Sequence, residues 1–425
     1  MPRIPYLRWW IVSLIFCASV LNYVDRQALS ILAPTIQKDL ALSNEDYASV
    51  LNWFLIAYTF ALILSGKIVD RFGVRFGLAL FVGWWSLANI LTGFARSLGS
   101  LAACRFFLGL GEAGNWTAAP KAVSEWFPAR ERGLAIGVYT LGATVGATLA
   151  PILIVGLASW HSWQAAFIVT GSAGLLWLIP WLWLYRRPSE HPRLSAEERT
   201  VIESGQAAEA AATTPSAAIP APAANWGKWH QVLLRREVVL LIFARMLTDP
   251  VWYFFQFWFA KYLYDARGLD QKSLSVTWVV YLAADVGVLA GGWLSGLLIA
   301  RGTTPVRSRL WIMLGCAALV PLGAAIPHVD ALWLVLAFGM VAVLAHLAWL
   351  INLSALVVDL VPRGSLAFAF GVIAAGSSLG GLMMNKAVGS LVTNTSYDPA
   401  FGFMLLLHPL AWCLAWQLRP RAKAI

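Results

Sequence analysis

Two acid–arginine pairs lie inside segments that are otherwise apolar. Asp25 and Arg26 are adjacent in VLNYVDRQALS (20–30), and Arg105 and Glu112 share the later stretch RFFLGLGE. A carboxylate beside an arginine can take up and release a proton, and a guanidinium can bind the carboxylate of a ligand. The chemistry open to these four residues is therefore proton transfer and the binding of an organic anion.

The position of these charges predicts that they meet inside the protein. Arg105 and Glu112 are seven residues apart, so on a helix they share one face, about 10 Å apart along the axis. An ionised side chain that faces lipid costs on the order of 2.5–3.5 kcal/mol. We expect an internal, water-accessible network in which Arg105 pairs with Asp25, with Glu112 or with both. The alternative is a static set of ion pairs that joins two helices.

Polar aromatic residues flank the charges. Tyr23 and Gln27 lie one turn apart beside Arg26, and Tyr58 brings a hydroxyl into the next apolar segment. Hydrogen-bonding groups, aromatic faces and a guanidinium together are typical of a site for a sugar-like acid. Tyrosines also pack at membrane interfaces, so this alternative stays open for each of them.

The composition indicates a membrane protein built from helices. Of 425 residues, 59% are hydrophobic and 12% are charged, with a mean hydropathy of +0.69. Soluble proteins are closer to one quarter charged. The first apolar run is predicted to be a retained helix rather than a cleaved signal peptide. Twelve spans are predicted, at 9–33, 47–66, 76–95, 99–120, 134–157, 163–185, 236–263, 274–299, 309–327, 331–358, 365–392 and 398–418.

The net charge of +10 reflects orientation in the membrane rather than binding of nucleic acid. Lys and Arg concentrate on alternate loops, so the positive-inside rule places both termini in the cytoplasm. The four cysteines lie in separate apolar segments, which predicts neither a metal site nor a disulfide framework. No cofactor and no nucleic-acid partner are expected.

A polar stretch divides the chain into two halves. The sequence AAEAAATTPSAAIPAPAAN (207–225) has no hydrophobic periodicity and is typical of a flexible linker. The predicted organisation is a six-helix bundle over 1–185, a cytoplasmic linker over 186–235 and a second six-helix bundle over 236–425. Secondary transporters are commonly built from such repeated halves.

The loop GKIVDRFGVRFG lies between the second and third predicted spans. Gly66 and Gly73 are expected to permit a close helix approach and a tight turn, and Asp70 to cap a helix or pair with a basic group. The spacing resembles the loop motif between helices 2 and 3 of the major facilitator superfamily. The resemblance covers the whole chain, and it implies the all-α, twelve-helix fold of that superfamily and gating roles for Asp70, Arg71 and Arg75.

Three further stretches narrow the resemblance. NYVDRQALSILAPTI, RFFLGLGEAGNWTAAPKAVSEWFP and SWQAAFIVTG look like the anion:cation symporter branch, and LTDPVWYFFQFWFAKYL looks closest to its bacterial hexuronate transporters. The resemblance implies that Asp25 and Glu112 carry protons and that Arg105 couples protonation to gating. It assigns ligand contacts to Arg26, Tyr23 and Tyr58. We also predict a ligand contact at Gln27, which lies beside Arg26.

The second half carries weaker matches. AHLAWLINLSALVVDLVP resembles the helix-10 stretch of hexuronate carriers, with Leu347 where a glutamine is usual. Thr140 likewise replaces an expected asparagine, which leaves room for a less hydroxylated anion. The predicted ligand contacts of this half are His346, Trp349, Asn352, Ser377 and Ser378.

Three further charges of the second half are expected to be buried. Asp249 precedes Pro250, which we expect to break its helix, and Asp249 either contacts the ligand or caps the broken turn. Asp285 and Lys386 are interpreted as structural ion-pair partners.

The resulting hypothesis is a monomeric, proton-coupled symporter in the bacterial inner membrane. It imports a small organic anion, a hexuronate or related sugar acid, by rocker-switch alternating access, with the proton and the lipid bilayer as its other partners. The alternatives are a symporter for another carboxylate (an aldonate, a dicarboxylate or an aromatic acid), a proton-driven exporter and a transport-dead sensor. No enzyme motif is present in the sequence.

Overall fold

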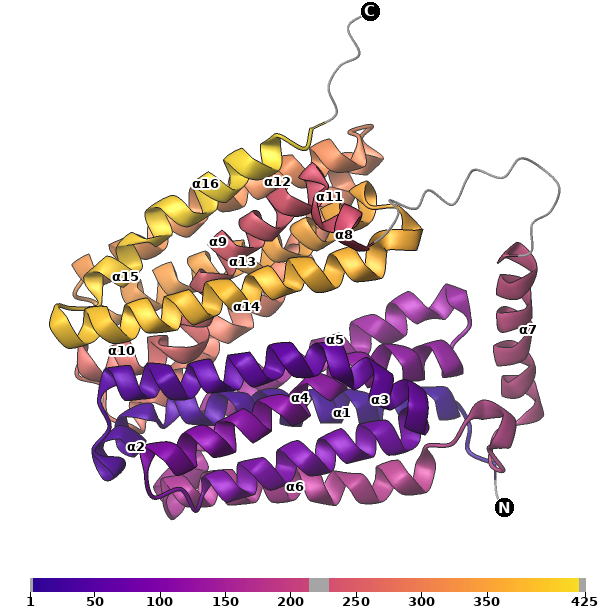
Figure 1. Ribbon diagram of the computed structural model, residues 1–425, viewed down its shortest axis with the longest axis horizontal. Coiled ribbons are helices and arrows are strands. Elements are labelled where there is room, and N and C mark those ends of the chain that lie inside the picture. Colours follow the sequence, from indigo (N-terminus) through magenta and orange to yellow (C-terminus); the bar gives the residue numbers. More distant parts are fainter. Residues whose placement is uncertain (1–2, 214–228, 420–425) are drawn as a thin grey trace, which may run out of the picture. The chain divides into compact units, whose positions relative to one another are not determined.

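The computed structural model of the chain describes residues 3–213 and 229–419 as a succession of helices (Figure 1). The chain forms two compact units. The first contains Met1–Leu29 and Trp53–Pro220, and the second contains Ser30–Asn52 and Ala221–Ile425. The stretch 30–52 therefore packs with the second unit although it precedes most of the first in sequence.

The first unit is built from long helices that follow one another in sequence, with one short 3-10 turn. They are α1 (Leu7–Ile31), most of α3 (Asn44–Thr92), α4 (Leu98–Trp126), α5 (Ala129–Trp160), α6 (Trp163–Leu184), η1 (Pro188–Glu190) and α7 (Ala196–Thr213). Serine hydroxyls cap two of them. Ser97 accepts from the backbone N–H of Ser100 to start α4, and Ser162 accepts from that of Ala165 to start α6.

The second unit contains α2 (Ala33–Leu40), the first turns of α3 and all later helices. These are α8 (Trp229–Leu233), α9 (Arg236–Phe257), α10 (Phe259–Asp265), η2 (Ser273–Thr277), α11 (Trp278–Ala300), α12 (Pro305–Leu319), η3 (Val320–His328), α13 (Leu332–Leu360), α14 (Arg363–Asn394), α15 (Asp398–Gly402) and α16 (Met404–Trp416). The Tyr47 hydroxyl joins α3 to this unit by donating to the carbonyl of Phe257 at 2.7 Å.

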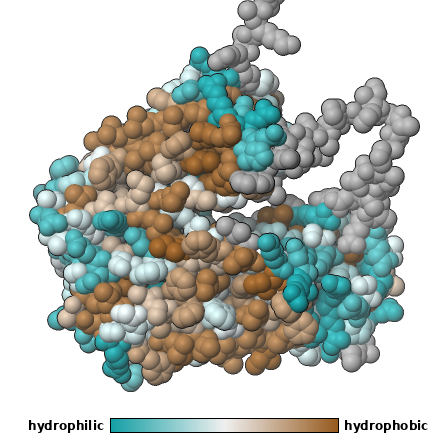
Figure 2. Space-filling model, viewed as in Figure 1, coloured by the Kyte–Doolittle hydropathy of each residue, from teal (hydrophilic) through white to brown (hydrophobic). Residues whose placement is uncertain are grey.

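Ten helical stretches of the described residues are long and apolar enough to cross a membrane. Figure 2 shows apolar side chains over the flanks of the helices, with hydrophilic residues gathered toward the helix ends. This distribution is expected where lipid covers the flanks and water covers the ends. The chain is a multi-pass, all-α membrane protein.

Two predicted spans meet at a kink within α3. α3 runs from Asn44 to Thr92 with a kink at Gly73, whose φ of 75° lies in the left-handed region. The tight turn predicted at Gly73 is confirmed, because glycine adopts such a backbone without a Cβ clash. The close approach predicted at Gly66 is wrong, since a Cβ there would meet open space.

Glycines allow α4 to pack tightly against α3. A Cβ added at Gly109 would lie 2.5 Å from the carbonyl oxygen of Phe54, and one at Gly111 would lie 2.7 Å from the amide nitrogen of Trp85. The close packing expected from small residues in a membrane helix is therefore found here. It brings the α4 charges next to those of its neighbours.

Part of the predicted linker is helical. Residues 196–213 form α7, so 207–213 are not the irregular chain that their composition predicts, because alanine-rich sequence favours helix. Residues 214–228 of the predicted linker lie outside the described residues.

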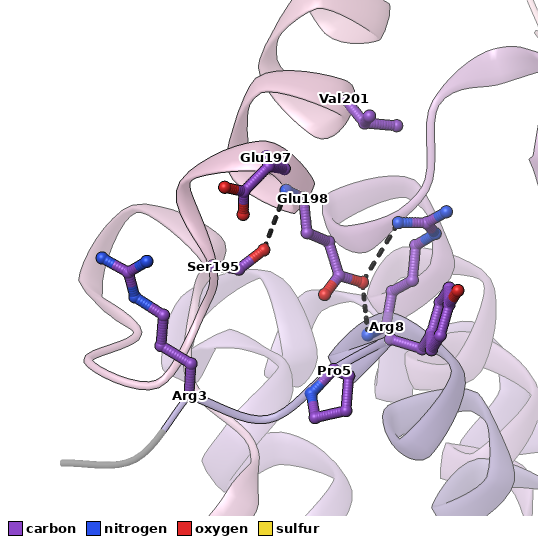
Figure 3. A pocket seen from close by; sticks show the side chains of 8 residues that line it. Arg3, Pro5, Arg8, Ser195, Glu197, Glu198 and Val201 are labelled. Carbon is purple, nitrogen blue, oxygen red and sulfur yellow. Dashed lines mark hydrogen bonds and ion pairs between the residues drawn. The ribbon is translucent and has the colours of Figure 1, made fainter.

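A carboxylate joins α7 to the start of α1 (Figure 3). Glu198 accepts hydrogen bonds from the backbone N–H groups of Leu7, at 3.0 Å, and Arg8, at 3.1 Å. Its carboxylate also pairs with the Arg8 guanidinium at 3.1 Å, and Arg8 reaches Glu131 of α5 at the same distance. Glu198 thus caps α1 from another helix.

The predicted break at Pro250 is displaced. α9 continues through Pro250 to Phe257, and the break comes at Trp258, between α9 and α10. Neighbouring helices and side chains can satisfy the carbonyl that a proline leaves without its N–H partner, so a membrane helix often continues through proline.

Candidate functional site

A buried ion pair joins α1 to α4. The Nε of Arg26 donates to Oε2 of Glu112 at 2.7 Å, and the two side chains are 10% and 0% exposed. Asn22, one turn before Arg26, donates to the backbone carbonyl of Glu112 at 3.4 Å and accepts from Arg26 Nη2 at 3.5 Å. The pair is held by both charge and hydrogen bonding, as a buried ion pair must be.

Three aromatic rings surround the Arg26 guanidinium. Its Cζ lies 4.8 Å from the ring centre of Tyr23, 4.8 Å from that of Tyr58 and 5.4 Å from that of Phe54. These distances are within the range of cation–π attraction. The rings replace part of the water that a guanidinium would otherwise need, and they keep its position fixed.

Asp25 has polar partners different from those of Arg26. Its Oδ1 accepts from Asn89 Nδ2 at 2.7 Å, and the same amide nitrogen lies 2.8 Å from Thr170 Oγ1. Trp85 also lies beside this carboxylate. Asp25 is fully buried, so these polar neighbours supply the hydrogen bonding that water would give at a surface.

Arg105 completes the cluster of charges. Its Nη1 donates to the backbone carbonyl of Asp25 at 3.3 Å, and its Cζ lies 5.1 Å from the ring centre of Phe167. Electrostatic interactions link Arg105 with both Asp25 and Glu112. The structure thus brings together the four charged residues on which the sequence analysis depends.

The structure specifies the contacts within this cluster. Glu112 pairs with Arg26, whereas Arg105 interacts electrostatically with both Asp25 and Glu112 and also donates to the main-chain carbonyl of Asp25. The Arg105 guanidinium packs against Phe167 of α6. Gln27 is fully buried on α1.

Asp70 of the predicted gating loop has a basic partner on α4. Lys121 of α4 lies 2.5 Å from Asp70 Oδ1, which agrees with the expectation that Asp70 pairs with a basic group. Arg75 donates from Nη2 to the carbonyl of Leu182, whereas Arg71 is exposed. The loop is therefore tied to both α4 and α6.

Two of the predicted ligand residues of the second unit, His346 and Trp349, lie in a buried aromatic cluster. Nδ1 of His346 lies 3.2 Å from Nε2 of His408, and Trp252 stacks on His346 with a ring separation of 6.3 Å. Trp349 packs edge-on against His408, with ring centres 5.3 Å apart. His346, His408 and Trp349 are at most 1% exposed, so each histidine depends on the other for hydrogen bonding.

Two other predicted ligand residues of this unit, Asn352 and Ser377, connect helices. Asn352 donates to the carbonyls of Gly291, at 3.0 Å, and Ala348, at 2.8 Å, and so joins α13 to α11. Ser377 Oγ lies 3.3 Å from the Tyr253 hydroxyl, and Ser378 is buried on the same helix, α14.

The three further charges of the second half have different environments. Asp249 pairs with Arg245 of the preceding turn at 2.6 Å and is buried. Asp285 is half-buried, and Lys386 is exposed. The expectation that Lys386 is buried is wrong, because a long lysine side chain on a helix flank can extend to water.

Sequence reasoning missed several partners of the predicted residues. Asn89, Asn22, Arg245 and His408 are polar residues inside apolar spans, which is a usable signal. Their partners lie far away in sequence, however, so their roles become visible only in the fold.

Comparison with known proteins identifies the family. The sequence profile of the Major Facilitator Superfamily matches residues 15–384. The hexuronate transporter of Escherichia coli K12 is 30% identical over 432 aligned residues, covering 100% of this chain and 97% of the relative. The galacturonate transporter of Dickeya chrysanthemi is 35% identical over 293 residues, covering 69% of this chain and 82% of the relative.

Solved structures agree on the fold. A bacterial homologue of the human lysosomal transporter Spinster, in an inward-facing and occupied conformation, aligns with a TM-score of 0.75 at 18% identity and covers 97% of each chain. The family model and the named relatives place the chain among transporters rather than enzymes. It belongs to the Major Facilitator Superfamily, in the group that contains bacterial sugar-acid transporters.

Proposed function

We propose that the chain is a proton-coupled symporter that imports a sugar acid, a hexuronate or a close relative, across the bacterial inner membrane. We further propose twelve spans with both termini in the cytoplasm and alternating access by movement of two six-helix bundles. The observation that carries the proposal is the buried Arg26–Glu112 ion pair with its three aromatic neighbours.

The ion pair supplies a way to couple a proton to an anion. While Glu112 is ionised it occupies the Arg26 guanidinium. Once Glu112 binds a proton, Arg26 becomes a buried cation without a counter-charge, which costs about 3–5 kcal/mol. A carboxylate from the substrate can then replace that of Glu112. Proton and substrate thereby favour each other's binding, as symport requires.

The aromatic residues suit the rest of a sugar acid. Tyr23 and Tyr58 flank the guanidinium and carry hydroxyl groups, and Phe54 adds an apolar face. Sugars present hydroxyl groups on their edges and C–H groups on their faces, so this combination matches both. The names of the relatives, which include transporters for hexuronate, galacturonate and D-galactonate, support this substrate class.

Asp25 and Arg105 form the second part of the proposed coupling. Asp25 is buried and interacts electrostatically with Glu112 and Arg105, so its protonation would change the field around both. We assign Asp25 a second proton-carrying role and Arg105 the role of transmitting its state to α4 and α6. His346, Trp349, Asn352, Ser377 and Ser378 remain proposed ligand contacts of the second half, and Asp70, Arg71 and Arg75 remain proposed gating residues.

The test is uptake into proteoliposomes that contain the purified protein and an imposed proton gradient. The panel consists of labelled glucuronate, galacturonate, galactonate and a dicarboxylate without a sugar skeleton. We expect gradient-dependent accumulation of at least one sugar acid, and loss of accumulation with retained binding in Asp25→Asn. If no acid accumulates under the gradient, or if Asp25→Asn accumulates substrate as the wild type does, the symport proposal fails.

A further inference from the structure

A small cavity lies where the kink of α3 meets the ends of α4 and α6. Its volume is about 220 Å³. The wall combines residues 72–76, around the kink of α3, with the chain that follows α6. Its charged and polar members are Arg75, Glu125, Tyr185, Arg186, Arg187 and Glu190. The cavity is formed entirely by the first unit and contains no residue of the Arg26–Glu112 site.

Three arginines, Arg75, Arg186 and Arg187, line this cavity. Arg75 is held by its bond to the carbonyl of Leu182 and by the Trp181 indole, which donates to the Arg75 carbonyl at 2.9 Å. The Nε of Arg75 is buried and makes no hydrogen bond within 3–213 and 229–419. Arg186 and Arg187 make no ion pair within the same residues. The cavity therefore offers cationic donors that the protein itself does not use.

Two carboxylates partly balance these charges. Glu125 accepts a hydrogen bond from the Tyr185 hydroxyl at 2.8 Å, and Glu190 lies on the chain that follows Arg187. Three arginines and two glutamates leave one net positive charge in the wall. A ligand with a single negative charge would neutralise it.

The surroundings of the cavity are those of a membrane boundary. Arg186 and Arg187 lie two and three residues beyond the apolar stretch Trp163–Leu184, and the kink lies within the stretch Leu64–Thr92. Phe72 and Phe76 also line the cavity, and they are 57% and 59% exposed. Large exposed aromatic rings beside unpaired arginines are expected where acyl chains meet headgroups.

We propose that this cavity binds the phosphodiester headgroup of an anionic phospholipid, with the guanidinium groups of Arg75, Arg186 and Arg187 as its donors. The phosphodiester of phosphatidylglycerol carries one negative charge, which matches the net charge of the wall. Its acyl chains would lie along Phe72 and Phe76. Basic pockets between membrane helices bind acidic headgroups in this way, and arginine suits phosphate because it donates in a planar fork.

The position of the cavity gives the lipid a structural consequence. Arg187 lies 3.8 Å from where a Cβ at Gly73 would be, so a bound phosphate would lie next to the kink of α3. Asp70 lies three residues before this kink and pairs with Lys121 of α4. A bound lipid would therefore stabilise the kink that joins the two halves of α3.

The test measures lipid binding by the purified full-length chain in detergent. Native mass spectrometry counts bound phosphatidylglycerol, and the melting temperature is followed on addition of phosphatidylglycerol, phosphatidylcholine or inorganic phosphate. We expect phosphatidylglycerol to remain bound and to raise the melting temperature, whereas the other two do neither. In Arg186→Gln/Arg187→Gln, binding of phosphatidylglycerol should be roughly 30-fold weaker, about fivefold for each arginine.

The matched control is Arg301→Gln/Arg307→Gln, which removes two exposed arginines of the second unit that make no ion pair within the described residues. We expect it to bind phosphatidylglycerol as the wild type does. Equal losses in both double variants, or unchanged binding in Arg186→Gln/Arg187→Gln, would overturn the proposal. An equal stabilisation by inorganic phosphate would instead identify a site for free anions. If the double variant melts early without lipid, Arg186→Lys/Arg187→Lys provides the comparison. It keeps both charges but loses the planar fork, so its binding of phosphatidylglycerol should lie between that of the wild type and that of the glutamine variant.

Discussion

Oε2 of Glu112 accepts from Arg26, whereas its other carboxylate oxygen, Oε1, makes no hydrogen bond within the described residues. The ion pair is therefore singly bonded, and Arg26 keeps further N–H groups for a second anion. We predict that Glu112→Gln, which keeps the shape but removes the charge, lowers gradient-driven uptake at least about tenfold. Exchange of labelled for unlabelled substrate should persist, because exchange needs no net movement of protons.

Both activities can be measured in the same proteoliposomes. The matched control is Glu203→Gln, which removes a carboxylate that is 61% exposed on α7. It should transport as the wild type does. If Glu112→Gln still concentrates substrate against its gradient, Glu112 is not a coupling acid.

Asn89 provides a second prediction. Its Nδ2 group is shared among Asp25 Oδ1, Thr170 Oγ1 and the carbonyl of Phe167. Asn89→Leu removes these bonds and leaves a buried carboxylate without its amide donor, which should cost about 1–3 kcal/mol of folding free energy. The loss should appear as a lower melting temperature in detergent and a reduced rate of uptake.

The control for this change is Asn394→Leu, which alters an amide on exposed turns of α14. It should melt within one or two degrees of the wild type, since surface substitutions usually change stability by about 0.5 kcal/mol or less. An Asn89→Leu variant with wild-type stability would mean that Asp25 does not need this donor.

The sequence was sufficient to predict the fold class and the residues of the main cluster. Charges inside apolar spans are costly, so Asp25, Arg26, Arg105 and Glu112 had to lie inside the protein. The glycines of α4 predicted close packing against a neighbour, and the contacts of Gly109 and Gly111 confirm this.

The sequence could not predict which acid pairs with which arginine. That choice depends on rotamers and on neighbours such as Phe167 and Phe54, which are distant in sequence. Lys386 was misinterpreted for a related reason, because membership of an apolar helix does not say which flank a side chain occupies. The helix α7 was missed because its composition resembles that of a linker, although alanine-rich sequence is also a good helix former.

The α7 connection can be tested with two neighbouring glutamates. Glu198 bonds the first N–H groups of α1 and Arg8, whereas Glu197, the residue before it, is exposed. Glu198→Ala should destabilise the protein by about 1–3 kcal/mol, since it removes a helix cap and leaves Arg8 with one partner. Glu197→Ala should be close to neutral.

Limited proteolysis and thermal melting both report on this change. Glu198→Ala should be cleaved faster within 196–213, because α7 loses its attachment to α1. Equal cleavage and equal melting temperatures of the two alanine variants would show that Glu198 does not hold α7 in place.

Buried His191 predicts a loss of stability in acid. Its Nδ1 accepts from the backbone N–H of Arg193 at 3.1 Å, so Nε2 carries the proton and donates to the carbonyl of Leu184 at 2.9 Å. Burial, followed by the nearby Arg186, Arg193 and Arg199, lowers the pKa of His191, and the bond to Leu184 opposes this only in part.

The direction of the pH effect follows from proton binding. Below about pH 6.5 this histidine is protonated in the unfolded chain, whereas in the folded protein it stays neutral to a lower pH. The unfolded state therefore binds more protons, and the stability of the folded protein falls as the pH falls. The melting temperature should decrease between pH 7.5 and pH 5, and His191→Gln should reduce that decrease. The control is His328→Gln, which changes an exposed histidine. This variant should show the same decrease in melting temperature as the wild type. An identical pH profile for His191→Gln would remove His191 as the cause.

The close contact of α4 with α3 predicts a contrast between two glycines of one helix. Gly109→Ala would place a methyl group 2.5 Å from the carbonyl oxygen of Phe54 and 3.2 Å from Cβ of Ala57, so the helices must separate. Overpacking of this kind costs about 1–3 kcal/mol, and it should also disturb Arg105 and Glu112 on either side. Gly99→Ala meets open space and should be neutral or stabilising by about 0.5–1 kcal/mol. The two variants are compared by thermal melting and by uptake assays. A Gly109→Ala variant that is as stable and as active as Gly99→Ala would contradict the close packing of α4 against α3.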